Sequence, residues 1–107
     1  MIALVFSYEV RDTAEFERVY GADGEWAQFF RQGSGYVGTE LLRDVKNHGR
    51  YFVVDRWESA DTYNAFAAEH REEYMRRVDD TRFYYEQELR FGTFETVWTA
   101  APHRQEG

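Results

Sequence analysis

The fold of this chain is decided by residues 35–59, which read GYVGTELLRDVKNHGRYFVVDRWES. Residues 36–45 and 51–57 are rich in β-branched and aromatic side chains, which favour extended strands. The residues between them, KNHGR at 46–50, have the Asn and Gly content typical of a tight turn. We therefore predict a β-hairpin in which Gly49 supplies a positive φ.

Another strand is predicted at the N-terminus, where residues 2–10 read IALVFSYEV. Its first half is continuously apolar, which indicates a strand covered on both faces at the centre of a sheet. Two short helices are expected next, over residues 13–20 and 25–31, because glycines separate two clusters of aromatic side chains. Asp12 or Thr13 is the expected N-cap of the first helix.

A longer helix and a last strand are predicted in the C-terminal half. After Ser59, apolar or aromatic side chains recur at helical spacing, at Tyr63, Phe66, Ala67, His70, Tyr74 and Val78. Asp79 and Asp80 are expected to break this helix, and residues 81–89 to form a further helical segment. Alternation over residues 90–98 predicts the last strand. We expect one domain over residues 1–98 and a C-terminal tail over residues 99–107.

The order strand, helix, strand, strand, helix, strand predicts an α+β fold of the ferredoxin-like βαββαβ type with an antiparallel sheet. Helices would then cover only one face of the sheet. Because the other face also carries apolar side chains, we expect a second copy of the chain to cover it. The prediction is a homodimer whose two sheets enclose a cavity, a dimeric α/β barrel, with Tyr8 and Tyr51 available to that interface.

Composition restricts the partners and the chemistry. The chain of 107 residues carries 13 basic and 20 acidic side chains, so its net charge is 13 − 20 = −7, and it has no Cys. An acidic chain without clustered Lys and Arg is not expected to bind nucleic acid. No stretch reaches 18 consecutive apolar residues, so we expect no membrane contact and a soluble cytoplasmic protein. The spacing of the His residues predicts no metal site.

The hairpin, together with Tyr63 and Phe66 after WES at 57–59, resembles the antibiotic biosynthesis monooxygenase superfamily of dimeric α/β barrels. The resemblance extends over residues 2–98. It implies a monooxygenase that oxidises an aromatic or polyketide-like small molecule with O2. Members of this kind need no metal or flavin, because the deprotonated phenolic substrate itself reduces oxygen.

The resemblance also implies site residues. Trp57 matches the family Trp that ends the third strand, and Tyr63 and Arg77 fall where the oxidising branch has a Tyr and an Arg. That branch carries an Asn four residues before the Trp, where this chain has Val53. In the haem-degrading branch, the iron ligand is a His on the second helix, and His70 is the candidate for it. Phe66 stands near the position of that branch's Trp.

Several side chains admit both a functional and a structural interpretation. His70 is a candidate base, or a hydrogen-bonded histidine at the edge of the core. Trp57 either lines a pocket or wedges the third strand against a helix. Asp55 is a candidate base of raised pKa if it is buried, or the partner of Arg43 or Arg90 in an ion pair between subunits.

We therefore expect catalytic roles for His70, Trp57 and Tyr63, and contacts to a small aromatic substrate from Tyr8, Tyr51, Asp55, Phe66, Arg77 and Trp26. The leading hypothesis is a cofactor-independent monooxygenase. The first alternative is a non-catalytic dimeric barrel that binds an apolar ligand. The second is a haem-binding or haem-degrading protein that holds iron through His70.

Overall fold

The computed structural model describes residues 1–100. Its elements follow the order β1 (Ile2–Glu9), α1 (Thr13–Tyr20), α2 (Glu25–Phe30), β2 (Tyr36–Arg43), β3 (Arg50–Trp57), α3 (Ala60–Glu69), α4 (Arg71–Thr81), a 3-10 turn (Arg82–Tyr84) and β4 (Gln87–Glu95). The strands form one antiparallel sheet in the order β2-β3-β1-β4, so β1 is central as predicted. This is the ferredoxin-like α+β fold expected from the sequence.

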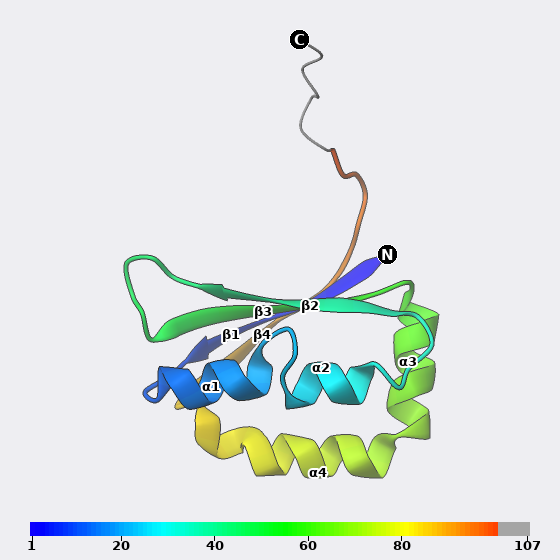
Figure 1. The fold of residues 1–107 in the computed structure, drawn as a ribbon. Helices are drawn as coiled ribbons and strands as arrows, with labels where there is room; N and C mark the ends of the chain where they lie inside the picture. Colours follow the sequence, from blue (N-terminus) through cyan, green and yellow to red (C-terminus); the bar gives the residue numbers. More distant parts are fainter. Residues whose placement is uncertain (101–107) are drawn as a thin grey trace.

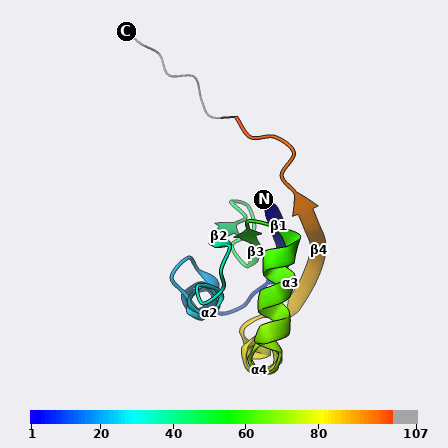
Figure 2. The same cartoon turned by 90° about the vertical axis from the view of Figure 1, so that its right-hand side faces the viewer.

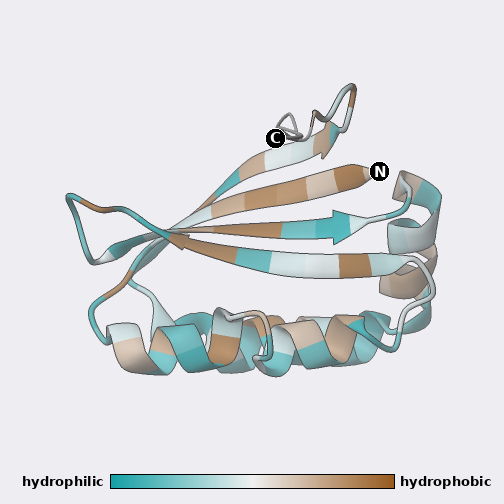
Figure 3. Cartoon of the chain, turned by 45° about the horizontal axis from the view of Figure 1, so that its top comes forward, coloured by the Kyte–Doolittle hydropathy of each residue, from teal (hydrophilic) through white to brown (hydrophobic). Residues whose placement is uncertain are grey.

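The helices lie on one side of the sheet. Helices α1, α2 and α4 run beneath it, and α3 stands at one end (Figure 1). The view turned by 90° shows the opposite face of the sheet without a helix (Figure 2). Figure 3 shows β1 as hydrophobic over its first half, in agreement with its central place between two neighbouring strands. The core therefore lies between the sheet and α1, α2 and α3.

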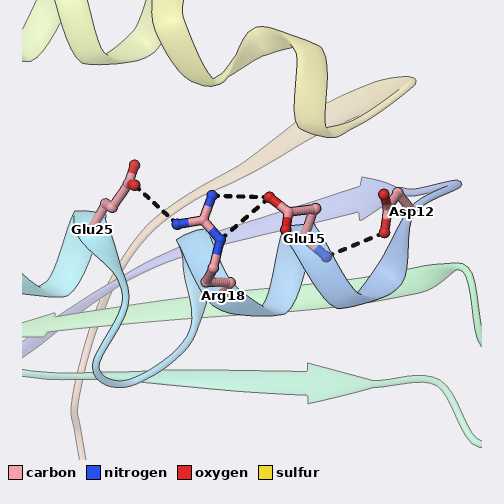
Figure 4. Close-up of polar contacts among 4 residues, drawn as sticks. All are labelled: Asp12, Glu15, Arg18 and Glu25. Atoms are coloured by element: carbon pink, nitrogen blue, oxygen red, sulfur yellow. Dashed lines mark hydrogen bonds and ion pairs between the residues drawn. The ribbon is translucent and has the colours of Figure 1, made fainter.

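Helix α1 begins and ends where local chemistry predicts. The Asp12 side chain accepts a hydrogen bond from the backbone N–H of Glu15 at 3.2 Å, so Asp12 is the N-cap. Arg18 donates to Glu15 at 2.9 Å and to Glu25 at 3.2 Å, which joins the exposed ends of α1 and α2 (Figure 4). These ion pairs are exposed and contribute little free energy of folding. Burial of Phe16 and Val19 against the sheet holds α1 in place.

The hairpin between β2 and β3 is confirmed, but the predicted role of Gly49 is wrong. In residues 1–100 only Gly35 and Gly92 have positive φ. Gly49 is needed for a different reason: a Cβ there would lie 2.8 Å from the carbonyl oxygen of Val10. The Val10 N–H donates to the Gly49 carbonyl at 2.7 Å, so the turn packs directly against the end of β1.

The break in the long helix lies at His70 and not at Asp79–Asp80. His70 has φ −109° and ψ 28°, which ends α3 and starts α4 in a new direction. The turn allows Phe66 and Tyr74 both to pack on Phe29, with ring centroids 5.0 and 5.8 Å away. Aromatic packing from two directions therefore outweighs the helical periodicity that continues through His70.

The predicted helical segment over residues 81–89 is also wrong. It is helical only as the 3-10 turn, and β4 already begins at Gln87, opposite Glu9 of β1. The last strand ends at Glu95, opposite Ile2, and the Thr96 N–H donates to the Met1 carbonyl at 2.8 Å. The length of β1 sets both ends of β4, because a strand pairs only where its neighbour continues. Residues 101–107 of the predicted tail lie outside the described residues.

Candidate functional site

A cavity of about 240 Å³ lies between the helix-side face of the sheet and the helices. All four strands and all four α-helices contribute to its wall. The lining is mainly aromatic, with a few polar groups: Phe6, Tyr8, Tyr20, Trp26, Phe30, Thr39, Val53, Asp55, Tyr63, Tyr74, Val78, Thr81, Tyr85, Glu88 and Arg90. A concave, largely apolar pocket with few polar groups is the usual form of a small-molecule site.

Asp55 is the buried carboxylate of this cavity. Its position on β3 turns the side chain toward the helices, and only 7% of the residue is exposed. Burial raises the pKa of Asp55 to about 6, and a hydrogen bond from the Thr39 hydroxyl at 2.7 Å partly offsets that rise. Within residues 1–100, no Arg or Lys forms an ion pair with Asp55. A proton acceptor of this kind, able to gain and lose its proton near neutral pH, suits general base chemistry.

Two hydrogen-bonded phenols line the cavity from the helix side. The hydroxyls of Tyr63 on α3 and Tyr74 on α4 lie 3.0 Å apart. Burial raises the pKa of Tyr74, with the neighbouring Tyr63 adding to the effect. Tyr74 therefore stays protonated at neutral pH. Two phenol hydroxyls joined by one hydrogen bond have one hydrogen left to donate to a bound molecule.

The fourth strand supplies charged groups. Tyr8 donates its hydroxyl hydrogen to Glu88 at 2.7 Å, and burial is the main reason that the pKa of Tyr8 is raised. The Arg90 guanidinium lies 5.9 Å from the centre of the Phe6 ring. Both Glu88 and Arg90 are exposed residues, so β4 carries a negative and a positive charge at the edge of an otherwise aromatic cavity.

The structure brings together four of the side chains predicted for the site: Tyr8, Trp26, Asp55 and Tyr63. The expectation that Tyr8, Tyr51 and Asp55 face the space between two subunits is wrong. Their side chains point to the helix side of their own chain, because Tyr8 and Tyr51 pack in the same core cluster as Phe16 of α1. The cavity described here is accordingly formed within one chain, and the alternative of an Asp55 ion pair between subunits loses its geometric basis.

Trp57 and Phe66 lie in the core, outside the cavity lining. Trp57 is fully buried and contacts Phe30, Tyr63 and Phe66 at centroid distances of 5.2 to 5.8 Å. A Cβ on Gly33 would lie 2.7 Å from the Trp57 ring, so the indole is fixed on that side as well. This placement matches the structural interpretation of Trp57, a wedge between β3 and the helices.

Three further predicted site residues also lie outside the cavity lining. Tyr51 is buried and donates its hydroxyl to Glu17 at 2.5 Å. Arg77 lies over the Phe29 ring at 4.7 Å and pairs with Glu73 at 3.1 Å. His70 sits at the junction of α3 and α4, where it borders a shallow, charged surface depression.

Sequence reasoning missed Thr39, Tyr74 and Arg90 as site residues. Tyr74 shares the helical stripe of Tyr63, so a signal for it was present. Thr39 and Arg90 lie on β2 and β4, and only the pairing of those strands with β3 and β1 shows which face they share with Asp55.

A model of the family described as antibiotic biosynthesis monooxygenase matches residues 1–77, which form most of the sheet and the helices of the cavity. The chain belongs to the antibiotic biosynthesis monooxygenase family. This confirms the resemblance seen in the hairpin. Among solved structures of the fold, a variant of SnoaB, a cofactor-independent oxygenase from Streptomyces nogalater, is 23% identical, with a TM-score of 0.76 over 92% of this chain and 94% of that one.

Haem-degrading proteins are similar as well. The heme-degrader MhuD from Mycobacterium tuberculosis, with two hemes bound in its active site, is 24% identical, with a TM-score of 0.64 over 94% of this chain and all of that one. A curated relative, the mycobilin-producing heme oxygenase of Mycobacterium tuberculosis, is 52% identical over 33 residues. That match spans 31% of this chain and 31% of the relative. At these identities the solved structures show the shared fold.

The cavity lining offers haem iron no axial ligand other than tyrosine. Axial ligands of haem iron are His, Cys, Met or a deprotonated Tyr. The described lining contains no His, Cys or Met. His70, the ligand proposed from the sequence, lies outside the cavity. Within residues 1–100 no three potential metal ligands cluster, and each helix is too short or too polar to cross a membrane.

Proposed function

We propose that this chain is a cofactor-independent monooxygenase that oxidises a small phenolic molecule with O2, using Asp55 as the general base. The observation that carries the proposal is a nearly fully buried carboxylate in the wall of an aromatic cavity. Membership of the monooxygenase family supports it. At about 240 Å³, the cavity lies just below the roughly 300–1,000 Å³ typical of drug-sized ligands, so we expect a compact, flat substrate.

The chemistry starts with a proton transfer from the substrate to Asp55. A phenol is neutral and reacts slowly with O2, whereas its anion is electron-rich and can transfer electrons to oxygen. For a simple phenol, one phenol and one O2 give one benzoquinone and one water. One oxygen atom enters the quinone and the other leaves as water, and the two hydrogens of that water equal in number the two that the phenol loses. The substrate supplies all the electrons that reduce oxygen, so no external reductant enters the reaction.

The remaining polar groups of the cavity favour the substrate anion. The free hydrogen of the Tyr63–Tyr74 pair is available to donate to an oxyanion. The Arg90 guanidinium on β4 adds a positive charge at the cavity edge. The family pattern has an Asn where this chain has Val53, and Val53 lines the cavity. We propose that the two phenols and Arg90 replace that amide as the source of oxyanion stabilisation.

The experiment compares oxygen uptake by the purified protein and its Asp55→Asn variant, with naphthol and the anthrone dithranol as substrates. We expect turnover without added metal or flavin, and a loss of roughly 10²–10⁴-fold in Asp55→Asn, the range for a positioned general base. Asp79→Asn, which alters an exposed carboxylate paired with Arg82, is the matched control and should keep full activity. Equal rates in the protein and in Asp55→Asn would refute the base assignment.

The pH profile gives a second test of the same base. Asp55 must be ionised to accept a proton, so kcat/KM should rise with pH and level off above the pKa of about 6. A protein that retains a defined aromatic ligand through purification, but never oxidises it in air, would instead favour the non-catalytic binding barrel.

We also propose that the active form is a homodimer. The helix-free face of the sheet exposes Leu89, Phe91 and Phe94 to 52%, 45% and 51%, and Phe91 stacks on Phe52 at 5.5 Å. An apolar sheet face of this kind is the expected contact surface for a second copy. A native mass spectrum should show a species near 2 × 12.8 = 25.6 kDa. A monomer of 12.8 kDa would refute the dimer.

A further inference from the structure

Asp55 is the inner end of a chain of three hydrogen-bonding groups on neighbouring strands. Thr39 of β2 pairs directly with Asp55 of β3 in the sheet register, and its hydroxyl donates to the Asp55 carboxylate at 2.7 Å. The hydroxyl of Tyr36, three residues earlier on β2, lies 2.5 Å from the same Thr39 oxygen. Asp55, Thr39 and Tyr36 are thus linked in one line.

The direction of these hydrogen bonds follows from the number of hydrogens. Thr39 has one hydroxyl hydrogen, and an ionised carboxylate can only accept. Thr39 therefore donates to Asp55, and Tyr36 must donate to Thr39. Burial raises the pKa of Tyr36, so its hydroxyl keeps the hydrogen that this arrangement requires.

This line of hydrogen bonds leads from the inside of the cavity to its outside. Asp55 and Thr39 line the cavity, whereas Tyr36 does not. The Tyr36 ring packs on Phe30 and Trp57 at centroid distances of 5.8 and 5.4 Å, which holds the phenol in place, yet the residue is only half-buried. Tyr36 is therefore the partly exposed end of the line, outside the cavity lining.

A base in a filled aromatic cavity must lose its proton before the next turnover. In the described structure, the hydrogen-bond partner of Asp55 is the hydroxyl of Thr39. When a substrate or product fills the cavity, this hydroxyl offers the proton a route away from Asp55. We propose that Thr39 and Tyr36 form a proton relay that carries the substrate-derived proton from Asp55 to solvent. The relay rests on the proposed function, because it is needed only if Asp55 acts as the base.

The relay returns each of its three side chains to its starting protonation state. Both hydroxyls first rotate, so that Thr39 donates to Tyr36 and Tyr36 donates to water. Asp55, protonated by the substrate, then passes its proton to the Thr39 oxygen, while the original Thr39 hydrogen moves to the Tyr36 oxygen and the Tyr36 hydrogen leaves to water. This transfer leaves Asp55 ionised and both hydroxyls in their starting arrangement. Solvent supplies one proton in exchange to the oxygen that leaves as water, so the overall reaction balances. Tyr36 and Thr39 are positioning residues in this scheme, since neither has to touch the reacting atoms.

Tyr36→Phe tests the outer step, because it removes the hydroxyl and keeps the ring that packs on Trp57. With dithranol as substrate, we expect the first turnover at the normal rate and later turnovers slowed about tenfold. This is less than the roughly 10²–10⁴-fold contribution of a general acid or base, because the relay only restores Asp55 between turnovers. The result is a burst in stopped-flow absorbance that the unaltered protein lacks. A role of Tyr36 in packing alone would change the first and later turnovers equally, and that outcome would overturn the relay.

Thr39→Val tests the inner step, with Thr39→Ser as its matched control. Valine keeps the shape of the side chain and removes the hydroxyl, whereas serine keeps the hydroxyl. We expect the burst in Thr39→Val and none in Thr39→Ser. An NMR titration of the Asp55 carboxyl carbon gives a readout independent of turnover. Its pKa should rise in Thr39→Val alone, since Glu88 and Arg90, the charged groups facing the same cavity, are unchanged in both variants.

The outcomes separate the relay from the function on which it rests. If Asp55→Asn turns over dithranol normally, the proposed base is wrong and the relay falls with it. If Asp55→Asn is inactive while Tyr36→Phe and Thr39→Val show no burst, the base stands and the relay is refuted. Inactivity of Asp55→Asn together with a burst in both relay variants would support the two proposals.

Discussion

Replacing Asp55 by Asn should stabilise the protein at neutral pH while it abolishes activity. Burial raises the pKa of this carboxyl from 3.8 to about 6. The difference of about 2 pKa units corresponds to about 3 kcal/mol at roughly 1.4 kcal/mol per unit. The folded state holds the Asp55 proton more tightly than the unfolded chain, so its contribution is most favourable below pH 4. It is lost as the pH rises through about 6.

The assay is urea unfolding of the protein and of Asp55→Asn, at one protein concentration and at several pH values from 4 to 8. All other groups titrate equally in both proteins, so the difference in unfolding free energy isolates Asp55. We expect Asp55→Asn to gain up to about 3 kcal/mol relative to the unaltered protein between pH 4 and pH 8. A difference in unfolding free energy that stays constant from pH 4 to pH 8 would show that ionisation of Asp55 does not destabilise the folded protein. That result would refute the reasoning.

Three further predictions concern packing, His70 and the open face of the sheet. Gly33→Ala should lower the unfolding free energy by about 1–3 kcal/mol, because its Cβ would meet the Trp57 ring; Gly38→Ala, with no atom within 4 Å of its Cβ, is the control in the same urea titration. His70→Ala should leave dithranol turnover and the haemin absorbance titration unchanged, since His70 lies outside the cavity lining; a tenfold loss of turnover would contradict this. Phe91→Arg should give a monomer in native mass spectrometry, and Phe83→Arg, at an exposed position in the turn before β4, should not.

The elements that the sequence predicted well are those with local causes. The Asp12 cap uses a backbone N–H only three residues away, and the hairpin at residues 46–50 joins two strands through one short turn. Central placement of β1 followed from its own apolar composition. Each of these features depends on residues within a few positions in the sequence, so the local sequence pattern is enough to predict it.

The elements that the sequence mispredicted depend on distant partners. The segment at 81–89 has a composition compatible with a helix, but pairing with β1 makes its last three residues the start of a strand. The helix breaks at His70 because aromatic side chains on both sides of the break pack on Phe29. The site shows the same limit: histidine is the most frequent general base in proteins, yet Asp55 and not His70 is the group enclosed by the cavity.

The sequence by itself determined the fold class and the presence of a buried aromatic layer on the sheet, because alternation and spacing indicate which side chains share a face. The motifs of the hairpin indicated the family by resemblance. Only the tertiary structure decided which of many aromatic and titratable side chains enclose the cavity. Asp55 and Trp57 lie on the same face of β3, yet Asp55 lines the cavity and Trp57 lies in the core. The difference is that Gly33 and Phe66 pack against Trp57. The pKa of Asp55 follows from that enclosure, since desolvation is a property of all the surrounding chain and not of the residue.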